Sequence, residues 1–227
     1  MTYAVKELYA TLQGEGAQTG RAAVFCRFTG CNLWSGLERD RPGAVCQFCD
    51  TDFVGTDGPG GGRFSDAATL AAAARRLWDT ECATGASSGA ADGEGGCAAG
   101  DPFVVCTGGE PLLQLDEPLI EAFHALGFAV AVETNGTIAA PAGLDWICVS
   151  PKGGARLVQR RGDELKLVYR QPGAAPEEFA GLDFTHFFLQ PMDGPDREAH
   201  TVAAIRYCLA HPRWRLSVQT HKYLGLR

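Results

Sequence analysis

Short β-type runs alternate with helix-type stretches along most of this chain, and that alternation constrains the fold more than any other feature. Helical periodicity covers three intervals, Asp66–Trp78, Leu112–Leu126 and Arg197–Ala210. Strands that alternate with helices predict an α/β fold with a parallel sheet. We expect a partial (β/α)6-type barrel with parallel strands, a reduced number of helices and an open rim. The expected strands are Ala22–Thr29, Phe103–Thr107, Ala129–Thr134, Trp146–Ser150, Leu165–Tyr169, His186–Gln190 and a short one near Arg215–Val218.

Two of the helices carry start signals. Ser65 is expected to cap the first, and Pro111 suits the first turn of the second, where a missing backbone N–H costs nothing. The length of 227 residues suits a single domain, 1–227. Within it, the Gly-, Ala- and Ser-rich segment 80–101 has few groups to bury and is expected to be a flexible insertion.

Composition narrows the class of protein. Hydrophobic residues make up 45% of the chain and charged residues 21%, as in ordinary globular proteins. No apolar run approaches the roughly 20 residues that span a bilayer, and the N-terminus lacks the pattern of a secretory signal. We therefore expect a cytoplasmic protein with no membrane contact. The net charge of −7, without a basic stripe, also predicts no nucleic-acid partner.

Polar motifs directly follow five of the expected strands. They are Cys31, Thr107–Pro111, Glu133–Gly136, Ser150–Lys152 and Gln190–Asp193. The carboxyl ends of parallel strands meet at one edge, where ligands bind in α/β folds. The sequence therefore predicts a functional site at this rim.

The cysteine spacing indicates a metal centre. Nine cysteines are an odd number in a chain without an export signal, which favours metal ligation over disulfides. Fourteen residues separate Cys31 from Cys46, and two separate Cys46 from Cys49. Structural zinc normally takes four protein ligands, whereas a [4Fe–4S] cluster held by three cysteines keeps one iron open to a ligand. Spacing alone favours the cluster and leaves a zinc-binding module as an alternative.

The other six cysteines carry no comparable signal. Free cysteine in an apolar run behaves as a small buried hydrophobe, and the two in the insertion have no third ligand beside them. These residues are Cys26, Cys106, Cys148 and Cys208 in apolar runs, and Cys82 and Cys97 in the insertion.

A glycine-rich motif follows the next strand. The two glycines of Thr107–Pro111 let backbone groups approach a ligand without side-chain obstruction. Three cysteines after one strand and GGEP after the next resemble the radical S-adenosylmethionine superfamily, although the fourteen-residue cysteine loop is longer than the usual spacing in that superfamily. A glycyl-radical activating enzyme is the alternative within it, and the QGEG segment at residues 13–16 favours a small enclosed substrate instead.

Further motifs narrow the resemblance to the 7-carboxy-7-deazaguanine synthases from end to end, apart from the insertion. They are YATLQGEG (9–16), FCRFTGCNLW (25–34), CDTDF (49–53), VETNG (132–136), SPK (150–152), LQPMD (189–193) and QTHKYLGLR (219–227). The resemblance implies a lyase that converts 6-carboxy-5,6,7,8-tetrahydropterin into 7-carboxy-7-deazaguanine with loss of ammonia, in queuosine and 7-deazapurine biosynthesis. It further implies a [4Fe–4S] cluster, S-adenosyl-L-methionine and Mg2+ as cofactors, an electron donor such as flavodoxin or ferredoxin, and a homodimer.

The residue types at the rim suit a pterin. Arg27, in an apolar strand, can pair with a carboxylate through two hydrogen bonds. Glutamates accept the adjacent donors of a 2-amino-4-oxopyrimidine, a role open to Glu15 and Glu133, while Gln13 can bond the ring edge. Histidine is a common general acid or base in proteins, so His221 suits proton transfer or substrate binding.

The resemblance assigns the remaining roles. It implies Glu15, Arg27, Glu133 and His221 as the catalytic set; Leu12, Gln13, Gly14, Thr107 and Arg227 as further substrate contacts; and Phe48, Cys49, Asp50, Gly109, Ser150, Pro151, Lys152, Gln190, Pro191, Met192 and Asp193 against S-adenosylmethionine. It also implies Cys31, Cys46 and Cys49 as cluster ligands and Thr51 as the Mg2+ ligand.

Overall fold

A curved nine-stranded sheet organises the chain in the computed structural model, which describes residues 2–82 and 101–226. The strand order is β3-β1-β2-β4-β5-β6-β7-β8-β9, and the strands from β2 through β9 run parallel. The strands are β1 (Tyr3–Leu12), β2 (Ala22–Phe28), β3 (Gly62–Phe64), β4 (Phe103–Gly108), β5 (Ala129–Thr134), β6 (Trp146–Val149), β7 (Arg161–Tyr169), β8 (Asp183–Pro191) and β9 (Trp214–Leu216).

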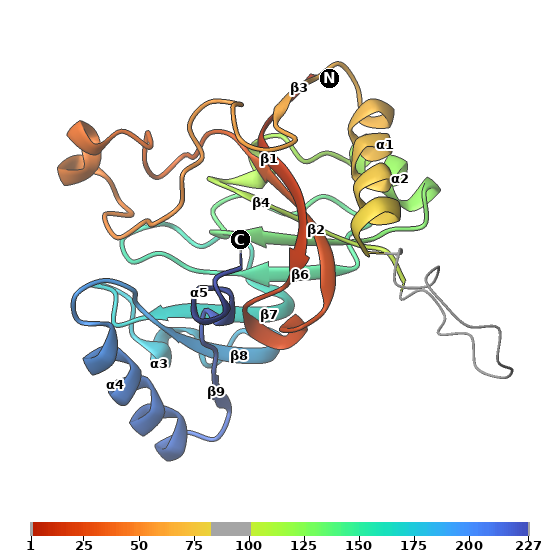
Figure 1. The fold of residues 1–227 in the computed structure, drawn as a ribbon. Coiled ribbons are helices and arrows are strands. Elements are labelled where there is room, and N and C mark those ends of the chain that lie inside the picture. Colours follow the sequence, from red (N-terminus) through yellow and green to blue (C-terminus); the bar gives the residue numbers. More distant parts are fainter. Residues whose placement is uncertain (1, 83–100, 227) are drawn as a thin grey trace, which may run out of the picture.

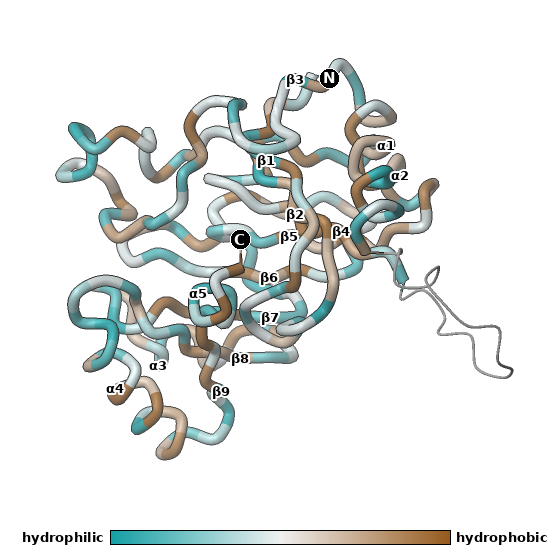
Figure 2. Tube along the Cα trace, in the orientation of Figure 1, coloured by the Kyte–Doolittle hydropathy of each residue, from teal (hydrophilic) through white to brown (hydrophobic). Residues whose placement is uncertain are grey.

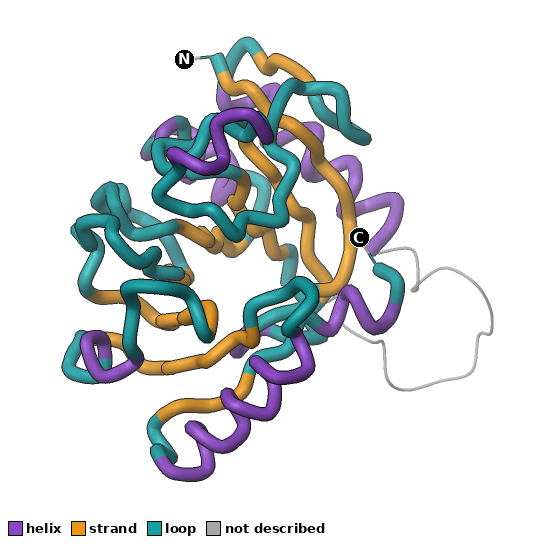
Figure 3. Tube along the Cα trace, turned by 90° about the vertical axis from the view of Figure 1, so that its left-hand side faces the viewer, coloured by secondary structure: helices purple, strands orange, loops and turns teal. Residues whose placement is uncertain are grey.

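Helices cover the outer side of this sheet. Helices α1 (Ala67–Leu77) and α2 (Glu117–Ala125) pack on the first half, and α4 (Arg197–Ala210) packs on β8 and β9 (Figure 1). The shorter α3 (Pro176–Phe179) and α5 (Thr220–Leu224) lie in the C-terminal half. Short non-α turns are η1 (Gly16–Gln18), η2 (Glu38–Gly43), η3 (Trp78–Cys82) and η5 (Pro111–Leu113). Viewed from the side, the strands follow an arc with α1 and α4 outside it (Figure 3).

The partial barrel is confirmed, with seven parallel strands and few helices. The edges of the described sheet are β3 and β9, so the barrel stays open. Sequence reasoning missed the two strands that run antiparallel to β2 or to each other, β1 and β3. Strand β3 spans three residues in a glycine-rich loop, and its pairing with β1 comes from tertiary contact.

Two predicted helix starts were wrong. Asp66, not Ser65, caps α1, because its carboxylate accepts the backbone N–H of Thr69 at 2.8 Å. Pro111 begins only a 3-10 turn; α2 begins at Glu117, where Asp116 accepts the N–H of Leu119. Asp66 caps α1 because it directly precedes the first helical residue, whereas Ser65 lies one position too early.

Apolar residues build two cores on the outer side of the sheet. One joins α1 and α2 to β1, β2, β4 and β5, and the other joins α4 to β7, β8 and β9. Figure 2 shows the hydrophobic segments gathered in the central strands, whereas the η2 loop is hydrophilic. Cys26, Cys106 and Cys148 are buried as expected, and Cys208 is half-buried against the second core.

No helix among the described residues is long and apolar enough to cross a membrane. Most of the expected insertion, including Cys97, lies outside the described residues.

Candidate active site

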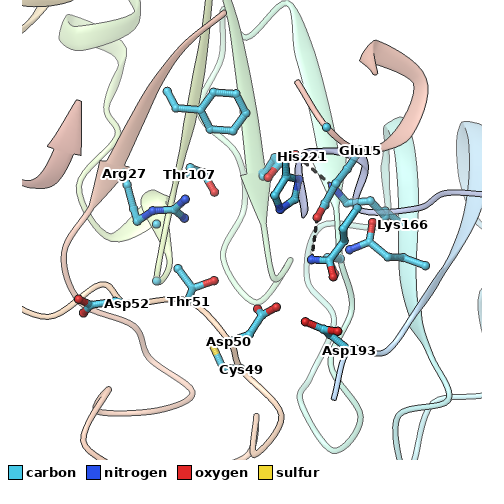
Figure 4. Close-up of a pocket in the computed structure, with 18 of the residues that line it drawn as sticks. Glu15, Arg27, Cys49, Asp50, Thr51, Asp52, Thr107, Lys166, Asp193 and His221 are labelled. Carbon is cyan, nitrogen blue, oxygen red and sulfur yellow. Dashed lines mark hydrogen bonds and ion pairs between the residues drawn. The ribbon is translucent and has the colours of Figure 1, made fainter. Parts of the chain in front are cut away.

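A cavity of about 640 Å³ opens at the carboxyl ends of the parallel strands, at the predicted rim (Figure 4). Most of the predicted site residues line it: Leu12, Gln13, Gly14, Glu15, Arg27, Cys46, Phe48, Cys49, Asp50, Thr51, Thr107, Gly109, Glu133, Ser150, Lys152, Gln190, Pro191, Met192, Asp193 and His221. Cys31 and Pro151 are not among the lining residues, and Arg227 lies outside the described residues.

Strand alternation explains why these side chains converge. In β2, Cys26 and Phe28 enter the outer core, so Arg27 points to the opposite, cavity side. Parallel pairing sets Arg27 beside Thr107 of β4, and Glu133 of β5 pairs with Cys148 of β6. The inner face of the sheet therefore carries a row of polar groups.

One side of the cavity carries Arg27, which two neighbouring side chains hold in place. Arg27 Nε donates to Glu7 Oε1 at 2.7 Å, and Arg27 Nη2 donates to the Tyr9 hydroxyl at 3.3 Å. The Tyr9 ring stacks on Phe25 with 5.7 Å between centroids. These contacts fix the guanidinium, so a carboxylate meets a preorganised partner rather than a mobile side chain.

The opposite side of the cavity combines two carboxylates and a lysine (Figure 4). Lys166 Nζ lies 2.6 Å from Glu15 Oε2 and 3.1 Å from Glu133 Oε1. Gln13 donates to Glu133 Oε1 at 3.1 Å, and Gln219 donates to Glu15 Oε1 at 3.0 Å. Burial disfavours the charged form of Glu15, but the adjacent Lys166 ammonium outweighs it and lowers the pKa of Glu15 to about 2.

The loop of residues 31–49, the cysteine loop, brings the thiols of Cys46 and Cys49 together. Cys46 and Cys49 share a hydrogen bond that lowers the pKa of Cys49 to about 6 and raises that of Cys46. Cys31 interacts electrostatically with both, and its sulfur accepts the backbone N–H of Leu33 at 3.4 Å. Among residues 2–82 and 101–226, no three His, Cys, Asp or Glu side chains meet closely enough to hold a single metal ion.

These cysteines fit a cluster with one open iron. Three thiols on one loop, with backbone N–H groups directed at sulfur, are the donor set such clusters use. Lys152 lies half-buried beside Cys46 and Cys49, and desolvation lowers the pKa of its ammonium. A cation at that position partly balances the negative charge of thiolates.

The glycine motif contacts the cysteine loop directly. A Cβ on Gly109 would overlap the carbonyl oxygen of Gly30 and lie 2.9 Å from the Cβ of Cys31. The Glu110 N–H also donates to the Gly30 carbonyl at 2.9 Å. Only glycine therefore lets the end of β4 approach the cysteine loop this closely.

The C-terminal helix α5 lies beside the cavity, which His221 and Lys222 line. A Cβ on Gly14 would collide with the imidazole of His221, so this helix packs directly on the QGEG turn. Lys222 Nζ bonds Asp50 Oδ2 and Asp193 Oδ2, each at 2.6 Å. Lys222 thereby joins the cysteine loop to the end of β8 at the cavity mouth.

Comparisons with known proteins agree with these motifs. Curated 7-carboxy-7-deazaguanine synthases of Caulobacter vibrioides and Bordetella pertussis are 64% and 63% identical, each aligned over 100% of both chains. The chain belongs to the 7-carboxy-7-deazaguanine synthase family. No protein-family model matches it. The crystal structure of QueE from Escherichia coli matches with a TM-score of 0.67 and 28% identity, over 97% of this chain and 95% of that one.

The resemblance to the 7-carboxy-7-deazaguanine synthases drawn from the motifs is thus confirmed. Sequence reasoning nevertheless missed several polar residues that line the cavity of this family member. They are Lys6, Glu7, Tyr9, Asp52, Lys166, Gln219 and Lys222. A signal for Lys166 existed, since a lysine inside the apolar run Leu165–Tyr169 is unusual for a strand. Lys222 offered none, because its partners are distant in sequence.

Proposed function

We propose that this chain is a radical S-adenosylmethionine lyase that converts 6-carboxy-5,6,7,8-tetrahydropterin into 7-carboxy-7-deazaguanine, with loss of ammonia. The names of relatives that are 56–64% identical over the whole chain support this reaction. The observation that carries it is one cavity shared by the cysteine loop, the glycine motif, a wall with Arg27 and an opposite wall with Glu15 and Glu133. We treat residues 1–227 as one catalytic domain.

The two walls suit the two ends of the substrate. The guanidinium of Arg27 would pair with the pterin carboxylate, because it stands ready on Glu7 and Tyr9. Glu15 and Glu133 would accept the N–H donors of the pyrimidine edge on the other side. Since Figure 4 shows Arg27 and Lys166 on opposite sides of the cavity, a flat bicyclic substrate would lie between them.

The cysteine loop and the glycine motif would hold the cofactors. When bound, the cluster and S-adenosylmethionine supply the electron and the carbon radical that remove a hydrogen atom from the substrate. Cys31, Cys46 and Cys49 would ligate three irons, and Gly109, which packs on the cysteine loop and lines the cavity, would lie against S-adenosylmethionine. The other cavity residues proposed against the cofactor are Phe48, Asp50, Ser150, Lys152 and Gln190 to Asp193.

Two further roles belong to residues near the substrate. Thr51 lines the cavity and would supply a hydroxyl ligand to Mg2+, which usually keeps several waters. His221 packs on Gly14 next to Glu15 and would hydrogen-bond the substrate or carry a proton. The flavodoxin- or ferredoxin-type electron donor, the homodimer and the cytoplasmic location also stay predictions.

Anaerobic turnover tests the proposal. Cluster-loaded protein is incubated with reductant, S-adenosylmethionine, Mg2+ and the pterin, and products are identified by mass spectrometry. We expect 7-carboxy-7-deazaguanine; its absence from protein that contains iron and sulfide would overturn the substrate assignment. Zinc in place of iron would favour the zinc-module alternative.

Two arginines of the β2 region provide a matched pair of variants. Arg27→Gln should raise KM for the pterin about 10- to 100-fold, the cost of one charge-assisted pairing. Arg21 lies before β2, stacks on Phe103 at 3.8 Å and does not line the cavity, so Arg21→Gln should keep the native KM. Equal KM values in both variants would contradict the role of Arg27.

A further inference from the structure

Lys166 occupies an unusual position for a lysine. It lies on β7 between Leu165 and Leu167, which enter the outer core, so it faces the cavity. Its side chain is 5% exposed, and burying an ammonium is costly unless anionic partners surround it. We therefore expect the buried Lys166 to act on the two carboxylates that it contacts, Glu15 and Glu133.

The hydrogen bonds divide the carboxylate oxygens unevenly. Lys166 and Gln13 both donate to Oε1 of Glu133, at 3.1 Å each. Among the described residues, no donor bonds Oε2 of Glu133, which therefore remains available to a ligand. Glu15 instead has both oxygens engaged, Oε2 by Lys166 and Oε1 by Gln219.

Several charged groups surround Lys166 and Glu15. The charged or titratable groups that act on Glu15 or Lys166 are Glu164 on β7, Glu133 on β5, Cys148 on β6, His221 on α5 and a second cation, Lys152, in the loop after β6. Three buried or half-buried carboxylates thus surround one ammonium. Without that ammonium, burial and mutual repulsion would favour protonation of at least one carboxylate.

We propose that Lys166 is a positioning residue, which keeps Glu15 ionised and turns Oε2 of Glu133 toward the adjacent N–H donors of a 2-amino-4-oxopyrimidine edge. This inference rests on the proposed function for the identity of the edge. The cluster formed by Lys166, Glu15 and Glu133 carries a net charge of −1. It therefore suits a neutral donor pair rather than an anion, and a protonated glutamate would present a donor where an acceptor is needed.

The first measurement follows ionisation rather than turnover. Protein labelled with 13C at glutamate side-chain carboxyls is titrated by NMR, with the Glu15 signal assigned from Glu15→Gln. In the native chain this signal should not titrate between about pH 8 and about pH 5, because its pKa is far lower. In Lys166→Met its midpoint should rise above 4.5, the ordinary value, since burial then acts unopposed by the adjacent ammonium.

A matched lysine controls for lost charge and packing. Lys6 is also buried and bridges two carboxylates at the cavity, Asp52 at 2.9 Å and Asp57 at 2.8 Å. Lys6→Met should leave the Glu15 signal of the folded protein unchanged. Lys166→Arg keeps the charge and should preserve the native titration; should Lys166→Met not fold, Lys166→Gln replaces it as the neutral variant.

Kinetics of the cluster-loaded enzyme provide the second measurement. Lys166→Met should raise KM for the pterin about 10- to 100-fold with a smaller change in kcat, and Lys166→Arg should recover most of that loss. Native enzyme that turns over the pterin, combined with an unchanged KM or an unchanged Glu15 titration in the neutral variant, would overturn the role of Lys166. Native enzyme without turnover would instead refute the proposed function.

Discussion

Replacing Glu110 tests how the strand ends beneath the cavity are held together. Glu110 lies inside the GGEP motif, where a carboxylate invites a catalytic interpretation, yet it is 0% exposed and does not line the cavity. Its Oε1 accepts the N–H of Leu112 at 2.9 Å and the hydroxyl of Thr134 at 2.8 Å, and its Oε2 accepts the N–H of Asn135 at 2.8 Å. One side chain therefore ties the end of β4 to the end of β5.

The size of the effect follows from these bonds. Glu110→Ala leaves three buried donors without an acceptor, and each unsatisfied group costs about 1–3 kcal/mol. Allowing for relaxation, we expect a loss of about 3–6 kcal/mol, a large part of the 5–15 kcal/mol typical of a domain. Burial also raises the pKa of Glu110, so the ionised form is itself costly. Glu110→Gln removes that charge and keeps one acceptor, for a smaller loss of about 1–3 kcal/mol.

Thermal unfolding followed by tryptophan fluorescence under nitrogen measures this order. At about 2–4 °C per kcal/mol for a chain of this size, Glu110→Ala should lower Tm by about 6–24 °C, and Glu110→Gln by less. Glu121 is exposed on α2, so Glu121→Gln should stay within about 0.5 kcal/mol of the native chain. A native Tm in Glu110→Ala, together with lost turnover and full cluster content, would refute the structural role and make Glu110 a catalytic group.

Three further variants probe other parts of the site. Cys49→Ala should abolish iron binding, whereas Cys208→Ala should not, because Cys208 is half-buried on α4 against the second core; equal iron content would contradict the ligand assignment. Gly14→Ala should displace His221 and raise KM for the pterin without loss of iron, and a native KM would show that α5 need not pack on the QGEG turn. The pKa of Glu15 is lowered on folding, so its ionised form stabilises the fold fully above about pH 4.5, and this contribution is lost as the pH falls toward 2. Between pH 6 and pH 3, the Tm of Glu15→Gln should therefore fall less steeply with falling pH than the Tm of the native chain.

Much of the fold was predictable because local pattern and global topology agree. All of the parallel strands except the three-residue β9 contain an apolar run long enough to be recognised, and parallel strands place their carboxyl ends together. The motifs after β2, β4, β5, β6 and β8 therefore had to meet at one rim. Alternation within β2 likewise explains why Arg27 faces away from Cys26 and Phe28.

The local sequence specified the edge of the sheet less strongly. Strand β1 pairs antiparallel with β2 and contains an irregularity between Val5 and Glu7, which breaks the simple alternation. Strand β3 is too short to show any periodicity of its own. Both depend on pairing with a distant segment, and that pairing is a property of the assembled sheet.

Residue identity by itself determined which chemistry this chain can support: three closely spaced thiols, a glycine-rich strand end, an arginine and two glutamates. Only the tertiary structure decided how those groups act on one another. It placed Lys166 between Glu15 and Glu133, and it buried Glu110 as a link between strands rather than a cavity group. Ionisation and hydrogen bonding depend on distances of a few ångströms between residues far apart in the chain, and folding alone sets those distances.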